Sequence, residues 1–287
     1  MAEDVTNQLM KTLSKARRKA PLRLTRGSVD KHLLYQWSVQ NPDDEVQFME
    51  RVYRTRRGTR PWVLREDFCG TAHTACHWVK GHARRRALGL DLDAATLDWG
   101  RKNNVAPLGD AAERVDLRLK DVSNTTRPLA DIVCALNFSY YIFDQVTELT
   151  AYFRKVRRSL APGGVFVLDN YGGWESQQVK EEPRRVETPR GPFTYIWDQA
   201  DFNPIDNRVL CHIHFKFSDG NMWRKAFTYA WRLYSPAEVC DALHAAGFRN
   251  VEVYWDHQDD TEMDEDYRVA RRAENTPAWL TYVVADG

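Results

Sequence analysis

The chain has 287 residues, of which 43% are hydrophobic and 12% aromatic, a composition typical of a globular protein with a substantial core. The formal net charge is only +1, so no overall electrostatic field would draw the protein onto nucleic acid. No apolar run is long enough for a signal peptide or a membrane span, and the five cysteines have neither paired nor metal-binding spacing. We therefore expect a soluble, cytoplasmic protein without a membrane or nucleic-acid partner and without a metal.

Residues 1–60 are predicted to form a helical extension, or lid, ahead of the main domain. A basic helix is expected at Met10–Lys19. A second helix is expected at Lys31–Gln40, capped by Ser28–Asp30, and a third begins after Asn41.

From Trp62 onward, apolar strand patterns alternate with helical patterns. The expected strands are Trp62–Arg65, Ala87–Leu92, Val115–Leu119, Asp131–Leu136, Val165–Asp169, Val251–Trp255 and Trp279–Val284. The expected helices between them are Thr71–Lys80, Ala94–Asn103, Val146–Leu160 and a late helix from Ser235. This alternation is typical of right-handed crossovers and parallel strands. The predicted fold class is therefore α/β, with a Rossmann-like, doubly wound sheet of seven strands.

The pattern changes in residues 172–231, where three aromatic-rich strands follow one another. They are expected at Phe193–Phe202, Arg208–Phe217 and Met222–Leu233, with turn residues between them. This segment is predicted to be an inserted antiparallel β meander that covers the substrate. The cofactor-binding domain would then comprise residues 61–171 and 232–287.

The most informative motif follows the first expected strand. Residues 66–72 read Glu-Asp-Phe-Cys-Gly-Thr-Ala, and Asp91 comes at the end of the second expected strand. In an open α/β sheet this spacing places a tight turn and a carboxylate side by side, where an adenosine-type cofactor binds. The acidic pair Glu66 and Asp67 would repel a pyrophosphate, but it would tolerate a cofactor that carries an ammonium and a sulfonium.

These residues resemble the first two motifs of class I S-adenosylmethionine-dependent methyltransferases, which typically carry Gly-x-Gly-x-Gly after an acidic residue. Here Phe68 and Ala72 replace the first and third glycines, and Gly70 is kept. The resemblance continues through residues 119–122, 131–138, 160–168 and 234–248, in the family's order. It is greatest with bacterial members that act on small molecules, and it assigns no particular substrate.

The resemblance implies S-adenosylmethionine as cofactor and S-adenosylhomocysteine as product. It places Asp91 at the ribose hydroxyls, Asp121 near the adenine, and Asn137 with Phe138 beside the methyl group. The complete set of implied cofactor-binding residues is Glu66, Phe68, Cys69, Gly70, Thr71, Ala72, Asp91, Leu92, Asp121, Val122, Asn137 and Phe138.

Candidates for catalysis and substrate binding are harder to choose, because any single aromatic or acidic residue could equally be a packing residue or a cap. The catalytic candidates are Tyr141, Asp169 and His214. The substrate-binding candidates are Tyr35, Tyr140, Tyr171 and Trp197. His212 and His214 have the spacing of a strand metal pair, but no third ligand is evident, so no metal is predicted.

Three functions remain open from the sequence. The first is methyl transfer to a nitrogen, oxygen or carbon atom of a small molecule, by a protein that could form a homodimer. The second is methylation of RNA or protein, suggested by the basic residues near the N-terminus but opposed by the balanced net charge. The third is a non-catalytic cofactor-binding protein, suggested by the two missing glycines.

Overall fold

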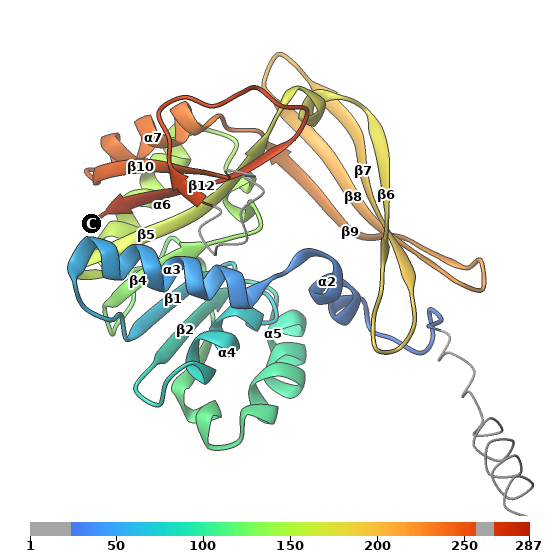
Figure 1. The fold of residues 1–287 in the computed structure, drawn as a ribbon, viewed down its shortest axis with the longest axis horizontal. Helices are drawn as coiled ribbons and strands as arrows, with labels where there is room; N and C mark the ends of the chain where they lie inside the picture. The colour runs from blue at the N-terminus through green and yellow to red at the C-terminus, as the bar shows by residue number, and fades with distance from the viewer. Residues whose placement is uncertain (1–23, 257–266) are drawn as a thin grey trace, which may run out of the picture.

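The computed structural model describes residues 24–256 and 267–287 and contains two β-sheets (Figure 1). The central sheet has eight strands in the order β11-β10-β12-β5-β4-β1-β2-β3, and the second sheet has four in the order β6-β7-β8-β9. The predicted α/β fold class is confirmed, with eight strands in place of seven. The helix expected at Met10–Lys19 lies outside the described residues.

The five strands β1 to β5 are parallel, and their order reverses between β1 and β4. Such a reversal leaves a crevice at the carboxyl ends of the two strands, which is where open α/β sheets bind ligands. The bounds are β1 (Val63–Asp67), β2 (Arg86–Asp91), β3 (Val115–Leu119), β4 (Ala130–Ala135) and β5 (Leu160–Gly172). The remaining strands are β10 (Arg249–Asp256), β11 (Tyr267–Val269) and β12 (Trp279–Asp286), and β12 is antiparallel to both β5 and β10.

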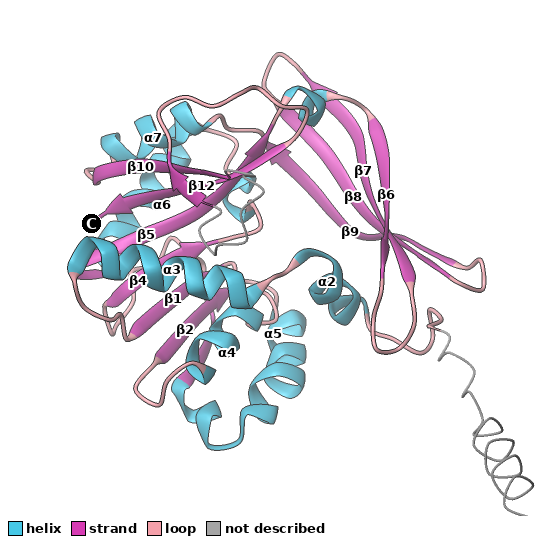
Figure 2. Cartoon of the chain, viewed as in Figure 1, coloured by secondary structure: helices cyan, strands magenta, loops and turns pink. Residues whose placement is uncertain are grey.

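Helices cover both faces of the central sheet (Figure 2). One face packs against α3 (Pro42–Arg57) and α4 (His73–Lys80), and the other against α6 (Val146–Ser159) and α7 (Pro236–Ala245). Side chains alternate between the two faces along β4, so Ile132 packs in the core under α3 and α4 and Val133 packs in the core under α6 and α7. The helix α5 (Ala94–Gly100) follows β2. None of the helices in the described part of the chain is both long enough and apolar enough to cross a bilayer.

The helix ends follow the sequence signals. At the start of α2 (Lys31–Val39), the Asp30 carboxylate accepts a hydrogen bond from the His32 backbone N–H at 2.8 Å. Pro42 occupies the first turn of α3, and Gly58 ends this helix with φ of 70°. Ser235 and Glu238 form a reciprocal capping box on α7.

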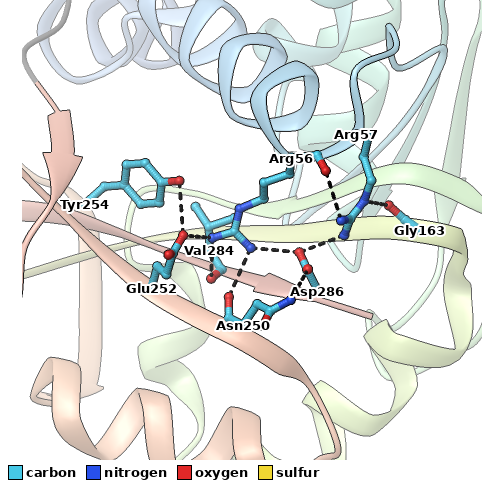
Figure 3. A network of polar contacts seen from close by, with 8 residues as sticks. All are labelled: Arg56, Arg57, Gly163, Asn250, Glu252, Tyr254, Val284 and Asp286. Carbon is cyan, nitrogen blue, oxygen red and sulfur yellow. Dashed lines mark hydrogen bonds and ion pairs between the residues drawn. The ribbon is translucent and has the colours of Figure 1, made fainter.

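The end of α3 is tied to the C-terminal strands by a network of charged groups (Figure 3). The Arg56 guanidinium contacts Asp286 at 2.7 Å and Glu252 at 2.6 Å, and Arg57 contacts Asp286 at 2.8 Å. Asn250 donates a further hydrogen bond to Asp286 at 2.9 Å. These donors hold the pKa of Asp286 below its usual value in spite of its partial burial. The network therefore fixes the N-terminal helical segment to the sheet.

The second sheet contains β6 (Lys180–Val186), β7 (Phe193–Asn203), β8 (Arg208–Phe217) and β9 (Met222–Arg232), all antiparallel. Three of the four strands were expected. The edge strand β6 was missed because its sequence, Lys-Glu-Glu-Pro-Arg-Arg-Val, has no apolar alternation and contains a proline. β11 was missed in the same way, since it is only three residues long. The division into residues 1–60, the two-part cofactor domain and residues 172–231 stays a prediction.

Candidate active site

Two adjoining cavities lie where β1, β2 and β4 end. The smaller has a volume of about 300 Å³ and is lined by the turn after β1, by Asp91 and by residues of α2. The larger has a volume of about 880 Å³ and extends between the second sheet and the loop before β12. Four residues line both cavities, namely Tyr35, Asn137, Tyr229 and Trp231. A ligand in one cavity can therefore meet a ligand in the other.

The turn after β1 keeps a glycine-type backbone although two of the three glycines are absent. Phe68, Gly70 and Ala72 have φ angles of 55°, 52° and 57°. This left-handed conformation costs a residue with a side chain about 1–2 kcal/mol. Packing offsets that cost, because the Phe68 ring contacts the rings of Phe143 and Tyr152 and Ala72 is fully buried. The turn predicted from the motif is therefore formed by tertiary contacts where the sequence lacks glycine.

Asp91 connects this turn to the end of β2. One carboxylate oxygen accepts from the Gly70 N–H at 2.8 Å, and the other accepts from the Asp93 N–H at 2.9 Å. Each carboxylate oxygen can accept two hydrogen bonds, so each retains one position for a ligand in the smaller cavity. The neighbouring Leu92 is 67% exposed and lies outside the lining of both cavities.

The smaller cavity fits an adenosyl cofactor with an amino-acid tail. A Cβ built on Gly70 would meet nothing nearer than a Thr96 methyl at 3.9 Å, so the backbone there faces open space. The Gln40 side-chain oxygen is buried in the lining and has no hydrogen-bonding partner in the described part of the chain. It can accept a hydrogen bond from an ammonium group. Asp91 supplies acceptors for vicinal hydroxyls at the same cavity.

Other residues of the predicted cofactor set have supporting positions. The Glu66 carboxyl is buried beside the Ala75 N–H, from which it accepts at 2.9 Å, and burial raises its pKa to about 8. Cys69 and Thr71 line the smaller cavity, and Gln36 of α2 donates to the Thr71 hydroxyl at 2.8 Å.

The loop after β3 is anchored by a hydrogen bond from a buried side chain, and it lines neither cavity. The buried Arg65 guanidinium donates to the Val122 carbonyl at 2.6 Å and to Asp67 at 2.6 Å. Tyr152 donates to the same Asp67 carboxylate at 2.7 Å. Asp121 is exposed, and its carboxylate accepts from the Ser123 N–H at 2.7 Å. The adenine contact expected of Asp121 and Val122 therefore stays a prediction.

The exit of β4 is shaped by a buried carboxylate on β5. Asn137 and Phe138 have φ of 57° and 56°, and their N–H groups donate to the Asp169 carboxylate at 2.6 and 2.9 Å. Burial raises the pKa of Asp169 to about 7, although these two hydrogen bonds favour the charged form. Asp169 therefore positions the junction between the cavities and does not itself line them.

The structure places some of the substrate-binding and catalytic candidates in the wall of the larger cavity and others in the core. Tyr35, Tyr171 and Trp197 line the larger cavity. Tyr140 and Tyr141 are fully buried beneath it, where the Tyr141 hydroxyl donates to the Tyr171 carbonyl at 3.0 Å and the Tyr140 hydroxyl accepts from Asn170. Neither tyrosine reaches the cavities, because the short helix at residues 139–142 turns its rings into the core.

His214 lies on the opposite face of the second sheet from the larger cavity. Its register partner is Ile196, whereas Trp197 is paired with the cavity residue Ile213. The structure therefore does not bring His214 to Tyr141 or Asp169. Strand alternation in β8 is the reason.

One group of three potential metal ligands occurs among the described residues, formed by Glu181, Asp198 and His214. The His214 Nδ1 atom faces the Lys225 N–H at 2.7 Å and must accept from it, so the neutral ring carries its proton on Nε2. That nitrogen then donates to Asp198 at 3.0 Å. A metal on Nε2 would require a proton on Nδ1, opposite another donor, so the local hydrogen bonds oppose coordination.

The sequence prediction missed most of the aromatic wall of the larger cavity. The alternation of aromatic residues in β9 favoured packing in a sheet core, whereas the structure places Tyr229 and Trp231 of that strand in the cavity wall. The nine aromatic residues that line the cavity are Tyr35, Phe138, Tyr171, Tyr195, Trp197, Tyr229, Trp231, Trp255 and Trp279.

Comparisons with known proteins agree with this geometry. Residues 69–166 match a family model described as "Methyltransferase domain". DesVI of Streptomyces venezuelae has a similar fold, with a TM-score of 0.66 and 18% identity over 91% of this chain and 98% of that one. An amino pentose methyltransferase from Micromonospora echinaspora, solved with S-adenosylmethionine, gives a TM-score of 0.63 and 17% identity over 89% and 95% of the two chains.

A sugar N-methyltransferase from a Streptoalloteichus species gives a TM-score of 0.60 and 20% identity, over 94% of this chain and 98% of that one. No curated protein sequence matches the chain. The chain has the fold of S-adenosylmethionine-dependent methyltransferases, as the sequence resemblance predicted, and its residues 69–166 match the methyltransferase model.

Proposed function

We propose that the protein transfers a methyl group from S-adenosylmethionine to a nucleophilic atom of a small molecule. The observation that carries this proposal is the junction of the two cavities at Asn137, where the smaller cavity has the features expected for the cofactor and the larger one has room for an acceptor. The cofactor supplies a methyl group that its sulfonium already activates. The enzyme then needs to align an acceptor in a dry site.

The residues of this chain divide that work between them. Asp91 and the turn at Phe68–Ala72 bind and orient the adenosyl group. Asp169 fixes the Asn137–Phe138 backbone at the point of transfer. The aromatic walls exclude water from the acceptor. Tyr35, which lines both cavities, stays a neutral phenol at physiological pH because burial raises its pKa well above the usual value.

A small acceptor is favoured because the second sheet covers the site. Trp197 and Tyr229 of that sheet line the larger cavity, whose volume of about 880 Å³ is in the range of small-molecule sites. Two of the similar structures are named as an amino pentose and a sugar N-methyltransferase, which supports the same class. The cytoplasm is the proposed location, and a homodimer stays a prediction.

Calorimetry with S-adenosylhomocysteine tests the first half of the proposal. We expect saturable binding with one site per chain, and a methyl-transfer screen over small-molecule amines, alcohols and carbon acids should then give a methylated product. Filter binding to bulk RNA should show no affinity at physiological salt. Absence of S-adenosylhomocysteine binding by the folded protein would refute the proposal, and a methylated RNA or protein would replace the acceptor class.

A further inference from the structure

The larger cavity combines aromatic faces with an acidic mouth. Trp231 stacks on Tyr229 with ring centroids 4.3 Å apart, and Trp197 lies 6.2 Å from Trp231. Phe138 and Tyr171, with centroids 4.6 Å apart, continue the same wall, because the Phe138 ring lies 6.4 Å from the Trp231 ring. Proteins bind alkylammonium groups in such aromatic-lined spaces, where the negative faces of the rings attract the cation.

The charged residues of the lining come from the segment around β10 and β12. Asp256 and Glu274 are acidic, and Arg272 is the single basic residue that lines this cavity in the described part of the chain. Recognition of a phosphate usually needs several converging cations or backbone N–H groups. One guanidinium that shares its rim with two carboxylates would not compensate the charge of a phosphorylated acceptor. The same rim attracts a cation.

The chemistry of the junction separates an amine from a hydroxyl acceptor. A hydroxyl must lose its proton to a base in the transition state. None of the four residues that line both cavities, Tyr35, Asn137, Tyr229 and Trp231, is a histidine, lysine or carboxylate, and the carboxylates Asp256 and Glu274 line only the larger cavity. Tyr171, Tyr195 and Tyr229 all have pKa values raised by burial, so they remain neutral phenols. An amine needs no base in the transition state, because its lone pair is already available once the amine is uncharged. An amine that enters as the ammonium loses one proton to solvent before transfer.

Tyr171 also provides a polar anchor within this apolar space. Its hydroxyl is buried beside the Cys211 thiol and has no other hydrogen-bonding partner among the described residues, and the residue lines the larger cavity. A thiol is only a weak partner for a hydroxyl. A ligand N–H group would satisfy it.

Building on the proposed function, we propose that the acceptor is an unphosphorylated amine on an apolar or aromatic body, held by the aromatic faces around Trp197, Tyr229 and Trp231. In the reaction, the amine lone pair forms the new N–C bond as the C–S bond breaks, and the electrons of that bond remain on sulfur. The resulting N-methylammonium loses one proton to solvent past the acidic mouth. The neutral methylamine that remains carries a lone pair, which permits a second transfer to the same nitrogen.

Binding of choline tests this inference without requiring the natural acceptor. The full-length protein, saturated with S-adenosylhomocysteine, is titrated with choline and with its uncharged analogue, in which a tert-butyl group replaces trimethylammonium. Because the two have the same shape, a cation-binding site should favour choline by about tenfold or more. Thymidine diphosphate serves as the phosphorylated probe, and we expect it to show no binding.

Two variants locate the site. Trp197→Leu keeps an apolar wall without its π-face and should abolish most of the preference for choline, whereas Trp174→Leu changes an exposed tryptophan outside the cavity lining and should keep it. If Trp197→Leu does not fold, Glu274→Gln removes one exposed rim charge, and it should weaken the binding of choline but not the binding of the uncharged analogue.

The outcomes separate this inference from the proposed function. Equal affinity for choline and the analogue, or thymidine diphosphate binding that Arg272→Ala weakens, would overturn the amine assignment while S-adenosylhomocysteine still bound. Loss of S-adenosylhomocysteine binding in the wild-type protein would instead refute the proposed function.

Discussion

Replacement of Asp91 by alanine is the most direct test of the cofactor site. The carboxylate makes hydrogen bonds of 2.8 and 2.9 Å to the Gly70 and Asp93 N–H groups, which leaves one acceptor position on each oxygen. A hydrogen bond to a charged group contributes about 1.5–3 kcal/mol. Two such bonds to one carboxylate are not fully additive. We therefore expect Asp91→Ala to weaken the binding of S-adenosylhomocysteine by about 2–4 kcal/mol, or roughly 30-fold to 1,000-fold in Kd.

Calorimetry measures this change, and thermal unfolding shows whether the variant is folded. Asp91→Asn keeps an oxygen for the Gly70 N–H while removing the charge, so we expect an intermediate loss that separates ligand contact from loosening of the turn. Asp116→Ala is the matched control, because Asp116 is an exposed carboxylate on the neighbouring strand β3, paired with Arg118. A folded Asp91→Ala protein that binds the ligand as well as the wild type would refute the assignment.

Three further changes probe the groups that support the site. In thermal unfolding, Glu66→Gln should stabilise the protein progressively as the pH rises from 4.5 towards 8. The fold raises the pKa of Glu66, so over this range the carboxyl ionises in the unfolded state before it does so in the folded state, and the wild-type protein loses stability that the uncharged glutamine does not lose. Equal shifts at pH 5 and pH 8 would contradict this. Asp169→Asn leaves only one oxygen to accept from the two N–H groups of Asn137 and Phe138, so one donor loses its partner. The affinity for S-adenosylhomocysteine, measured by calorimetry, should fall by about 1–3 kcal/mol; unchanged affinity would show that the backbone after β4 does not depend on this carboxylate. Asp286→Asn should cost about 1–3 kcal/mol in urea unfolding at pH 7, and because the pKa of Asp286 is lowered in the fold, the difference from wild type should shrink as the pH falls through that lowered pKa. A difference that persists in strong acid would be evidence against the charge network.

The turn after β1 shows how far sequence reasoning could reach. The spacing from Glu66 to Asp91 predicted the turn, the carboxylate and their proximity, and the Gly70–Asp91 hydrogen bond agrees with this. The sequence did not show how Phe68 and Ala72 could replace glycine. That depends on rings from the chain after β4 and from α6, which reach Phe68 only in the folded protein.

The candidate residues that the structure places away from the cavities share one physical reason. Tyr140, Tyr141 and Asp169 were chosen because they follow the right strand ends, but whether a side chain there faces a ligand or the core depends on the backbone turn that carries it. His214 was chosen from a strand face, and the registry of β8 with β7 decides which face meets the cavity. Neither the conformation of that turn nor the register of β8 can be predicted from local spacing in the sequence.

The sequence by itself determined the α/β class, the order of the strands and helices apart from β6 and β11, the cofactor turn with its acid, and the aromatic character of the strands β7 and β9. Each of these is a local pattern, set by residues that are close in the chain. Only the tertiary structure decided that the aromatic face lines a cavity, that this cavity meets the cofactor cavity at Asn137, and that an acidic rim borders it. The walls of that cavity come from α2, β4, the second sheet and the segment before β12, and only folding brings such distant segments together.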